Sequence, residues 1–167
     1  MNKLTSSVFA GAVMIAGLLP ASAMAGPDDD AQIQALEACF ASAFTAKDVD
    51  AIMKVYSPDV LVFDVIPPRV YAGAAAYRED WKGFLNQFAG PVKFEITDLV
   101  VSTEGPMGYR HSIQHISGDV PKGAPVDMTV RVTDVYRKQG DVWLIVHEHV
   151  SAPVDLATGK ADLTSKP

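Results

Sequence analysis

The sequence predicts an α+β fold: a cone in which three helices wrap one face of a strongly curved antiparallel sheet. Up to about residue 88, apolar residues recur every three or four positions, the spacing of amphipathic helices. From Val92 onward they alternate with polar residues, the spacing of half-buried strands. The turns Glu104-Gly105-Pro106 and Gln139-Gly140-Asp141 divide this second half into hairpins. Hairpins in series form one sheet, and three helices can cover only one of its faces.

Three helices are predicted before residue 91. Asp28-Asp29-Asp30 suits a helix N-terminus, and a helical stripe follows it up to Lys47. Asp48 can cap a short second helix that ends at Ser57-Pro58. The third helix runs from Gly73 to Gly90-Pro91. The apolar faces of the first and third helices are formed by Ile33, Leu36, Phe40, Phe44, and by Tyr77, Trp81, Phe84, Leu85 and Phe88.

The strands are predicted from β-branched or alternating runs. Pro67-Pro68 makes a turn between the first two, and the phase slips near Asp98-Leu99, which indicates a bulge. The remaining residues after 152 are polar and are expected to lie over the surface. The expected strands are Val60–Val65, Arg69–Tyr71, a strand beginning at Val92, Tyr109–Ser117, Val126–Arg137 and Val142–Ser151.

Residues 1–25 are predicted to be a cleaved secretory signal peptide. Lys3 gives a positive start, Val8–Leu19 is an uncharged apolar run, and Ala23-Met24-Ala25 forms an A-x-A cleavage site. A membrane anchor is the weaker alternative, because a transmembrane helix needs about 20 apolar residues. Cleavage follows Ala25 or Ala23. The mature protein is therefore predicted to be periplasmic or secreted, with no membrane contact after cleavage.

Residues 26–167 are predicted to form one domain, with a core at about 31–153 and a polar tail at 154–167. The chain has 14 basic and 20 acidic side chains, a net charge of −6, which argues against a nucleic-acid partner. One cysteine, Cys39, excludes an intrachain disulfide framework, and its apolar surroundings predict that it is buried. Phosphate-loop, dinucleotide-binding, nucleophile-elbow and His-Glu-x-x-His motifs are absent from the sequence. Neither a cofactor nor a metal is predicted.

The four histidines of the sequence fall in its strand-rich half. His147 and His149 flank Glu148 on a strand, so they project from one face and Glu148 from the other. His111 and His115 share a face of another strand. These side chains could serve acid–base chemistry in a pocket, ligate a metal, or be structural, and all three interpretations stay open. A His-x-His pair without a third ligand is a weak metal signal, so the pocket role is favoured.

Asp64 is a second candidate, because it closes an apolar strand just before a double proline. Such surroundings raise the pKa of a carboxyl toward that of a useful base, although an aspartate there could equally cap the turn. Arg131 lies between two valines in mid-strand. It could face solvent or a dimer interface, or it could be buried to bind an anionic ligand.

Three stretches resemble the nuclear transport factor 2-like superfamily, in its SnoaL-like and ketosteroid isomerase-like branch. They are KDVDAIMKVYSPDVLVFD, YAGAAAYREDW and VRVTDVYRKQGDVWLIVHEHVSAPVD. The resemblance runs from about Ala31 to Pro153 and implies the same cone fold. Relatives dimerise through the outer sheet face, so a homodimer is expected. The fold hosts isomerases, dehydratases, cyclases, hydrolases and non-catalytic binders, so it does not specify an activity.

The resemblance carries the general-base aspartate of ketosteroid isomerase onto Asp64. That enzyme pairs its aspartate base with two oxyanion donors, a tyrosine and a protonated aspartate. The two donor positions fall on Phe40 and near Val130, and neither side chain can donate a hydrogen bond. The resemblance therefore implies that the base is retained and both donors are lost. Ile145, His147 and His149 fall where the last strand of relatives lines the pocket, so the histidines could replace the donors.

Together these observations predict an exported pocket protein for a small molecule. If it is an enzyme, it acts by proton transfer as an isomerase, cyclase or dehydratase, with Asp64, His147 and His149 as catalytic residues. The alternative is non-catalytic binding of a small apolar or anionic ligand. The predicted ligand-binding residues are His111, Arg131, Tyr77, Trp81, Phe40 and Val130.

Overall fold

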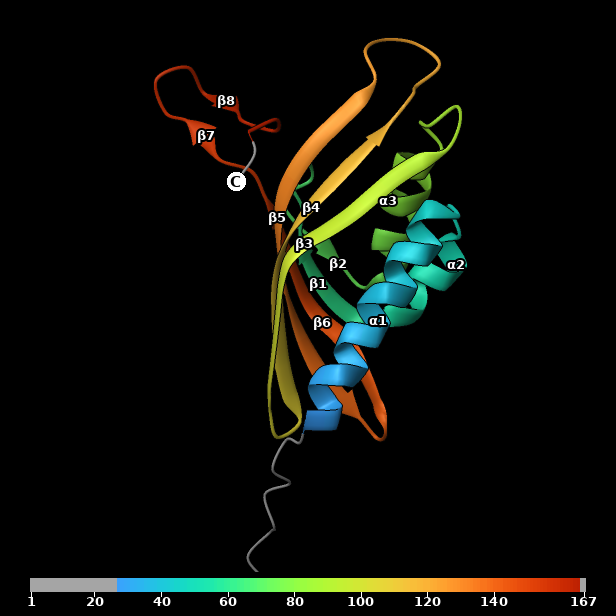
Figure 1. Cartoon of the computed structure of the whole chain (residues 1–167), viewed down its shortest axis with the longest axis vertical. Helices are drawn as coiled ribbons and strands as arrows, with labels where there is room; N and C mark the ends of the chain where they lie inside the picture. The colour runs from blue at the N-terminus through green and yellow to red at the C-terminus, as the bar shows by residue number, and fades with distance from the viewer. Residues whose placement is uncertain (1–26, 166–167) are drawn as a thin grey trace, which may run out of the picture.

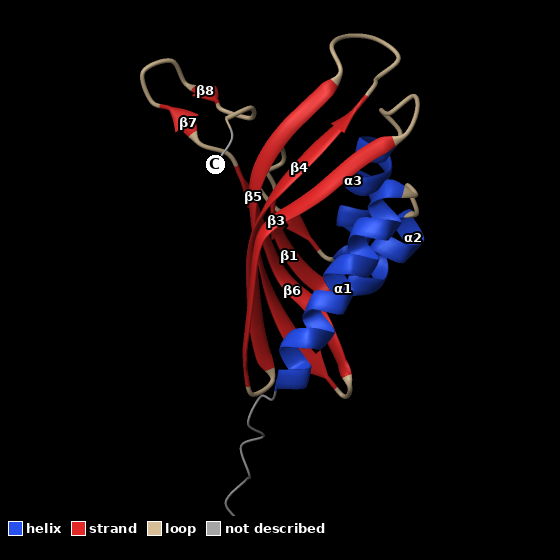
Figure 2. Cartoon of the chain, in the orientation of Figure 1, coloured by secondary structure: helices blue, strands red, loops and turns tan. Residues whose placement is uncertain are grey.

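The computed structural model describes residues 27–165, and the predicted signal peptide lies outside them. Three helices lie on one side of a long curved sheet (Figures 1 and 2). They are α1 (Pro27–Thr45), α2 (Val49–Ile52), which continues into a 3₁₀ turn (Met53–Val55), and α3 (Ala74–Leu85). The strands are β1 (Tyr56–Phe63), β2 (Tyr71–Ala72), β3 (Val92–Glu104), β4 (Met107–Gly118), β5 (Val126–Gln139) and β6 (Val142–Ser151).

The six strands form one sheet in the order β2-β1-β6-β5-β4-β3. The hairpins β3–β4, β4–β5 and β5–β6 are antiparallel, as predicted, and so is β1–β2. The pair β1–β6 is parallel. The chain runs from β1 to β6 through β2, α3 and three hairpins, so no single turn sets the relative direction of β1 and β6. A small second hairpin, β7 (Val154–Asp155) with β8 (Lys160–Ala161), projects from the sheet (Figure 1).

The core lies between the inner, concave face of the sheet and the helices. Phe40 and Phe44 of α1 meet Trp81 of α3 and Phe94 of β3 in ring contacts. Helix α1 comes close to the sheet at Gly108, where a Cβ would lie 2.9 Å from Ile33 Cδ1 and would displace the end of that side chain. The predicted positions of the two apolar helix faces are thus confirmed.

Two bulges adjust which residues face the core. The ladder between β3 and β4 shifts between Thr97 and Val100, and Asp98 has a φ of 52°, where the sequence predicts a phase slip. The ladder between β5 and β6 shifts between Val135 and Tyr136. This second bulge inserts Val146, because Ile145 pairs with Tyr136 and His147 with Val135. It was not predicted, and it inverts the side-chain alternation of β6 beyond residue 146.

Cys39 is exposed, so the prediction of its burial is wrong. The buried side of α1 is formed by Ile33, Glu37, Phe40 and Phe44, and Cys39 lies on another face of the helix. No helix among residues 27–165 is long and apolar enough to cross a membrane.

Candidate active site

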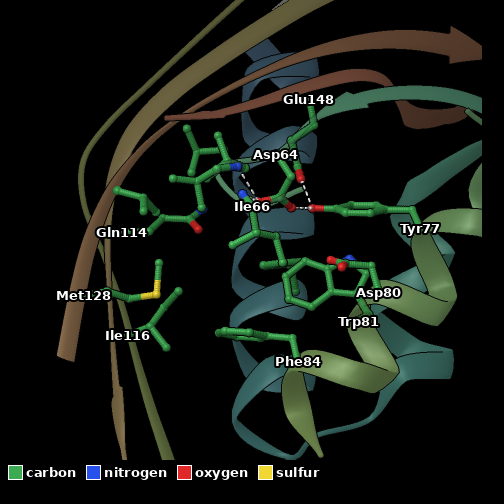
Figure 3. A pocket seen from close by; sticks show the side chains of 15 residues that line it. Asp64, Ile66, Tyr77, Asp80, Trp81, Phe84, Gln114, Ile116, Met128 and Glu148 are labelled. Atoms are coloured by element: carbon green, nitrogen blue, oxygen red, sulfur yellow. Dashed lines mark hydrogen bonds between the residues drawn. The ribbon is translucent and has the colours of Figure 1, made fainter. Parts of the chain in front are cut away.

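A cavity of about 80 Å³ lies between the concave sheet and α3 (Figure 3). It is partly open, so it suits a compact ligand or the end of a longer one. Most of its wall is carbon, from helices α1 and α3, the segment after β1, and strands β4, β5 and β6. The apolar lining residues are Phe40, Val65, Ile66, Trp81, Phe84, Ile116, Met128, Val130, Val132 and Val150, and the others are Asp64, Tyr77, Asp80, Gln114 and Glu148.

Asp64 lies where β1 ends and the chain turns toward the prolines. Its Oδ1 accepts hydrogen bonds from the backbone N–H groups of Val65, at 2.5 Å, and Ile66, at 3.4 Å. Burial raises the pKa of Asp64, and the nearby charge of Asp80 raises it further, against these two hydrogen bonds and one from Tyr77. Both interpretations made from the sequence therefore hold in part, because Asp64 caps the turn and is also a desolvated carboxyl in a cavity wall.

Glu148 is the second carboxyl, on β6, and only 3% of it is exposed. Its Oε2 accepts a hydrogen bond from Tyr56 at 2.8 Å, and its Oε1 lies 2.5 Å from the Tyr77 hydroxyl. Burial raises the pKa of Glu148 to about 7, although the two tyrosines and Arg110 oppose the shift. Burial also raises the pKa of both tyrosines well above 10, so both remain hydrogen-bond donors at neutral pH.

The Tyr77 hydroxyl joins the two carboxyls. It lies 3.1 Å from Asp64 Oδ2 as well as 2.5 Å from Glu148 Oε1. One hydroxyl carries one hydrogen, so it cannot donate to both carboxylates. Both contacts are favourable only when one carboxyl holds a proton and donates it to the tyrosine oxygen. A proton on either carboxyl would satisfy all three groups. Glu148–H donating to Tyr77, with Tyr77 donating to Asp64, is the favoured arrangement, because burial raises the pKa of Glu148 to about 7.

Arg110 forms a buried ion cluster beside this site, on β4. Only 1% of Arg110 is exposed, and its Nη2 lies 2.6 Å from Asp134 and 3.1 Å from Glu37. These two acids outweigh the burial of the guanidinium and raise the pKa of Arg110 still further, so it stays charged. Burial raises the pKa of Asp134, with Arg110 opposing the shift. Glu148 is close enough for its charge to affect both groups, so the cluster and the site are electrostatically linked.

The structure separates the predicted catalytic histidines from Asp64. His147 and His149 lie on the outer face of the sheet and do not line the cavity. His147 Nδ1 is 2.8 Å from the Leu61 carbonyl oxygen, and both rings pack against Phe63. The expectation of one cavity holding both histidines and Asp64 is wrong, because the bulge at Val146 turns Glu148 inward instead.

The predicted ligand-binding residues divide by sheet face. Phe40, Tyr77, Trp81 and Val130 line the cavity. Neither His111 nor Arg131 does: both are exposed on the outer face, where the His111 ring stacks on Tyr109. His115 is on that face too, 2.7 Å from Asp127. Among residues 27–165 no group of three or more side chains is arranged to hold a metal ion.

Three polar residues of the cavity wall were not predicted from the sequence: Glu148, Gln114 and Asp80. Asp80 lies one helical turn from Tyr77 on a helix face that was assigned correctly, so helical spacing could have found it. Gln114 is an even-numbered residue of β4, whereas His111 and His115 are odd-numbered. The alternation of side chains along a strand would therefore have placed Gln114 on the other sheet face from these histidines. Nothing in the sequence marks the bulge that brings Glu148 inward.

A curved sheet closed by helices around a mostly apolar cavity with a few polar groups defines a class of small-molecule pocket folds. The sequence profile of the SnoaL-like domain matches residues 33–155, and the chain belongs to this family. The nuclear transport factor 2-like assignment made from the sequence is thus confirmed, as is the α+β fold. No relative among curated proteins matches the chain.

Solved structures agree on the fold. An NTF2-like protein of unknown function from Pseudomonas putida KT2440 is 30% identical, with a TM-score of 0.78, over 86% of this chain and 99% of that one. A ketosteroid isomerase-like protein from Erwinia carotovora atroseptica is 17% identical, with a TM-score of 0.64, over 75% of this chain and 97% of that one. A proposed scytalone dehydratase from Novosphingobium aromaticivorans is 11% identical, with a TM-score of 0.68, over 84% of this chain and 93% of that one. The last two likenesses concern the fold alone.

Proposed function

We propose that this protein is a proton-transfer enzyme for a small, uncharged, largely apolar substrate, as an isomerase, cyclase or dehydratase. The observation that carries the proposal is the contact of Asp64 and Glu148 through one tyrosine hydroxyl in a cavity with a mostly carbon wall. Two carboxyls with different burial, only one of them protonated, leave an ionised carboxylate in the cavity wall that can act as a base.

Asp64 is the base in this proposal. A substrate C–H bond breaks, its proton passes to the Asp64 carboxylate, and the electron pair stays on the substrate. In isomerisation, Asp64 returns the proton to a different carbon of the substrate. In dehydration, the electron pair forms a C=C bond as the C–O bond breaks, and the proton from Asp64 joins the departing hydroxide to give water. Glu148 and Tyr77 stabilise the charged form of Asp64 before the transfer, because Tyr77 donates to it. The histidines predicted to be catalytic have no part in this scheme.

The second candidate is a pocket that binds without catalysis. The observation that favours it is the backbone capping by Asp64, which gives this side chain a structural role. An anionic ligand is disfavoured for either function, because the cavity wall contains three carboxyls and no Lys, Arg or His among the described residues.

Replacing Asp64 by asparagine distinguishes the two functions. The amide keeps an oxygen for the Val65 N–H but cannot accept a proton as a base. We expect the variant to lower the rate of α-hydrogen exchange of cyclohexanone in D₂O by about 100-fold or more, relative to the wild type. The exchange is followed by proton NMR. Asp59→Asn, at an exposed position on the same strand, is the control and should exchange at the wild-type rate.

The contrary result would be wild-type exchange no faster than buffer, or equal exchange in Asp64→Asn. Either outcome supports the binding function. In that case the substitution should cost about 1 kcal/mol of unfolding free energy or less, as for other lost capping contacts, and leave ketone binding unchanged.

We also propose that the mature protein is exported and forms a homodimer. Export rests on the charged start, short apolar run and A-x-A site of the N-terminal sequence. The dimer rests on apolar side chains exposed on the outer sheet face, including Leu61, Phe63, Val100 and Tyr109. Intact-mass analysis of periplasmic material should find Gly26 or Met24 as the first residue, and light scattering should give twice the chain mass. Cytoplasmic protein retaining Met1 would contradict export, and a monomer at micromolar concentration would contradict the dimer.

A further inference from the structure

Asp80 is a carboxyl of the cavity wall to which the proposed proton transfer gives no part. It lies on α3, three residues after Tyr77, and both side chains line the cavity. Residues three apart on a helix lie on the same face, so Asp80 enters the site beside the tyrosine that contacts Asp64. Figure 3 shows its side chain next to that of Tyr77, on the cavity side of the helix.

The carboxyl of Asp80 is held by Tyr71, the first residue of β2. The Tyr71 hydroxyl donates to Asp80 Oδ1 at 2.7 Å and lies 3.1 Å from the Pro67 carbonyl oxygen. Burial raises the pKa of Tyr71, and the hydrogen bond to Asp80 raises it further, so this hydroxyl stays a donor at neutral pH. Tyr71 pairs with Val62 of β1, two residues before Asp64. The donor that holds Asp80 therefore belongs to the strand pair that carries Asp64.

The charge of Asp80 is not balanced by a cation of the cavity wall. No Lys, Arg or His among residues 27–165 lines this cavity. The two cations that flank Asp80 along α3 pair with other acids: Arg78 with Asp50, and Lys82 Nζ with Glu79 at 2.7 Å. The negative charge of Asp80 therefore acts on the other groups of the cavity.

Asp64 is the group on which this charge acts. The ionisable side chains that face Asp64 are Tyr77 and Asp80 of α3, Tyr71 of β2 and Glu148 of β6. Both tyrosines are uncharged at neutral pH, and Glu148 carries a proton in the favoured arrangement. Asp80 is thus the negative neighbour that remains, and its charge adds to the effect of burial in raising the pKa of Asp64. A carboxylate that holds a proton more tightly is a stronger base.

We propose that Asp80 is a positioning residue for the proton transfer: its carboxylate, held in place by Tyr71, makes Asp64 a stronger base. This inference rests on the proposed function for the identity of the base, and it adds the residue that sets the strength of that base. Removing the charge of Asp80 should have two effects. Asp64 should ionise at a lower pH, and the ionised Asp64 should take a substrate proton more slowly.

Asp80→Asn tests the proposal, because the amide keeps an oxygen acceptor for Tyr71 while the charge is lost. The titration of Asp64 is followed by ¹³C NMR in protein labelled at the aspartate carboxyl carbons, and its resonance is assigned from its loss in Asp64→Asn. We expect the pH midpoint of Asp64 to fall by about 0.5 or more in Asp80→Asn. At about pH 8.5, above both midpoints, α-hydrogen exchange of cyclohexanone should be slower than in the wild type by about twofold or more.

Glu79→Gln is the matched control. It removes the same charge from the neighbouring position of α3, where the side chain is exposed and does not line the cavity. Both the midpoint of Asp64 and the exchange rate should stay at their wild-type values. A purely structural role of Asp80 would lower the free energy of unfolding in Asp80→Asn, measured in urea, and would leave the midpoint of Asp64 unchanged.

The proposal is overturned if the midpoint of Asp64 in Asp80→Asn equals or exceeds that of the wild type, or if Glu79→Gln lowers it as much. It is also overturned if the midpoint falls but exchange at about pH 8.5 remains as fast as in the wild type. Wild-type protein that exchanges cyclohexanone no faster than buffer would contradict the proposed function instead. The NMR titration needs no activity, so the effect of Asp80 on Asp64 is measured in either case.

Discussion

Replacing Arg110 by methionine is expected to lower the free energy of unfolding by about 3–5 kcal/mol. The substitution removes the cation between Asp134 and Glu37 and leaves two carboxylates in a nearly water-free site. Methionine roughly matches the length of the arginine stem, so the loss comes from charge and hydrogen bonding more than from a cavity. Urea denaturation at neutral pH measures the loss, and Arg131→Met, exposed on the adjacent strand β5, is the matched control.

Arg131→Met should change the unfolding free energy by about 0.5 kcal/mol or less, as is usual for exposed positions. An Arg110→Met variant that loses under about 1 kcal/mol would show that the two acids do not depend on this cation.

The raised pKa of Glu148 predicts an unusual dependence of the unfolding free energy on pH. Its pKa is about 7 in the folded protein against 4.5 for an ordinary glutamate, so the folded chain binds more protons between these pH values. Stability therefore falls as pH rises from about 4.5 to about 7 and levels off above. The shift corresponds to roughly 3 kcal/mol, from about 1.4 kcal/mol for each unit of pKa. Glu148→Gln should lack this part of the fall.

Urea denaturation at a series of pH values between about 4.5 and 8 measures this effect. Some fall should persist in Glu148→Gln, because the pKa of Asp64 is raised in the folded protein too and acts in the same direction. Glu95→Gln, exposed on β3, should retain the full wild-type dependence. Equal slopes in wild type and Glu148→Gln would contradict a proton held on Glu148 at neutral pH.

Hydrophobic spacing was sufficient to predict the hairpins and the buried faces of the first and third helices. It did not predict where the second helix ends, because Ser57 and Pro58 already belong to β1. Phe40 and Trp81 lie in the cavity wall because the apolar face of a helix that packs on a sheet must point toward the sheet. The position of Asp64 was also predictable, since the strand that carries it is an apolar run ending at a double proline. These features depend on contacts that are local in the sequence.

The side-chain alternation of β6 depends on a non-local feature. Val146 is one extra residue of β6 opposite β5, and it reverses which sheet face each later side chain of β6 points to. His147 and His149 therefore lie on the outer face, and Glu148 lies on the core face. The bulge is a property of the pairing between two strands, and a run of alternating residues read alone does not reveal it.

We infer that near pH 7 one proton is held on Glu148, while Tyr77 donates to the ionised Asp64. Infrared difference spectroscopy of the carboxyl C=O stretch detects this proton, with pH titrated from about 5 to 9 in wild type and Glu148→Gln. We predict a protonated-carboxyl band in the wild type that titrates near pH 7 and is absent from the variant. A wild-type spectrum without such a band at about pH 6, or a band unchanged by Glu148→Gln, would contradict a proton held on Glu148.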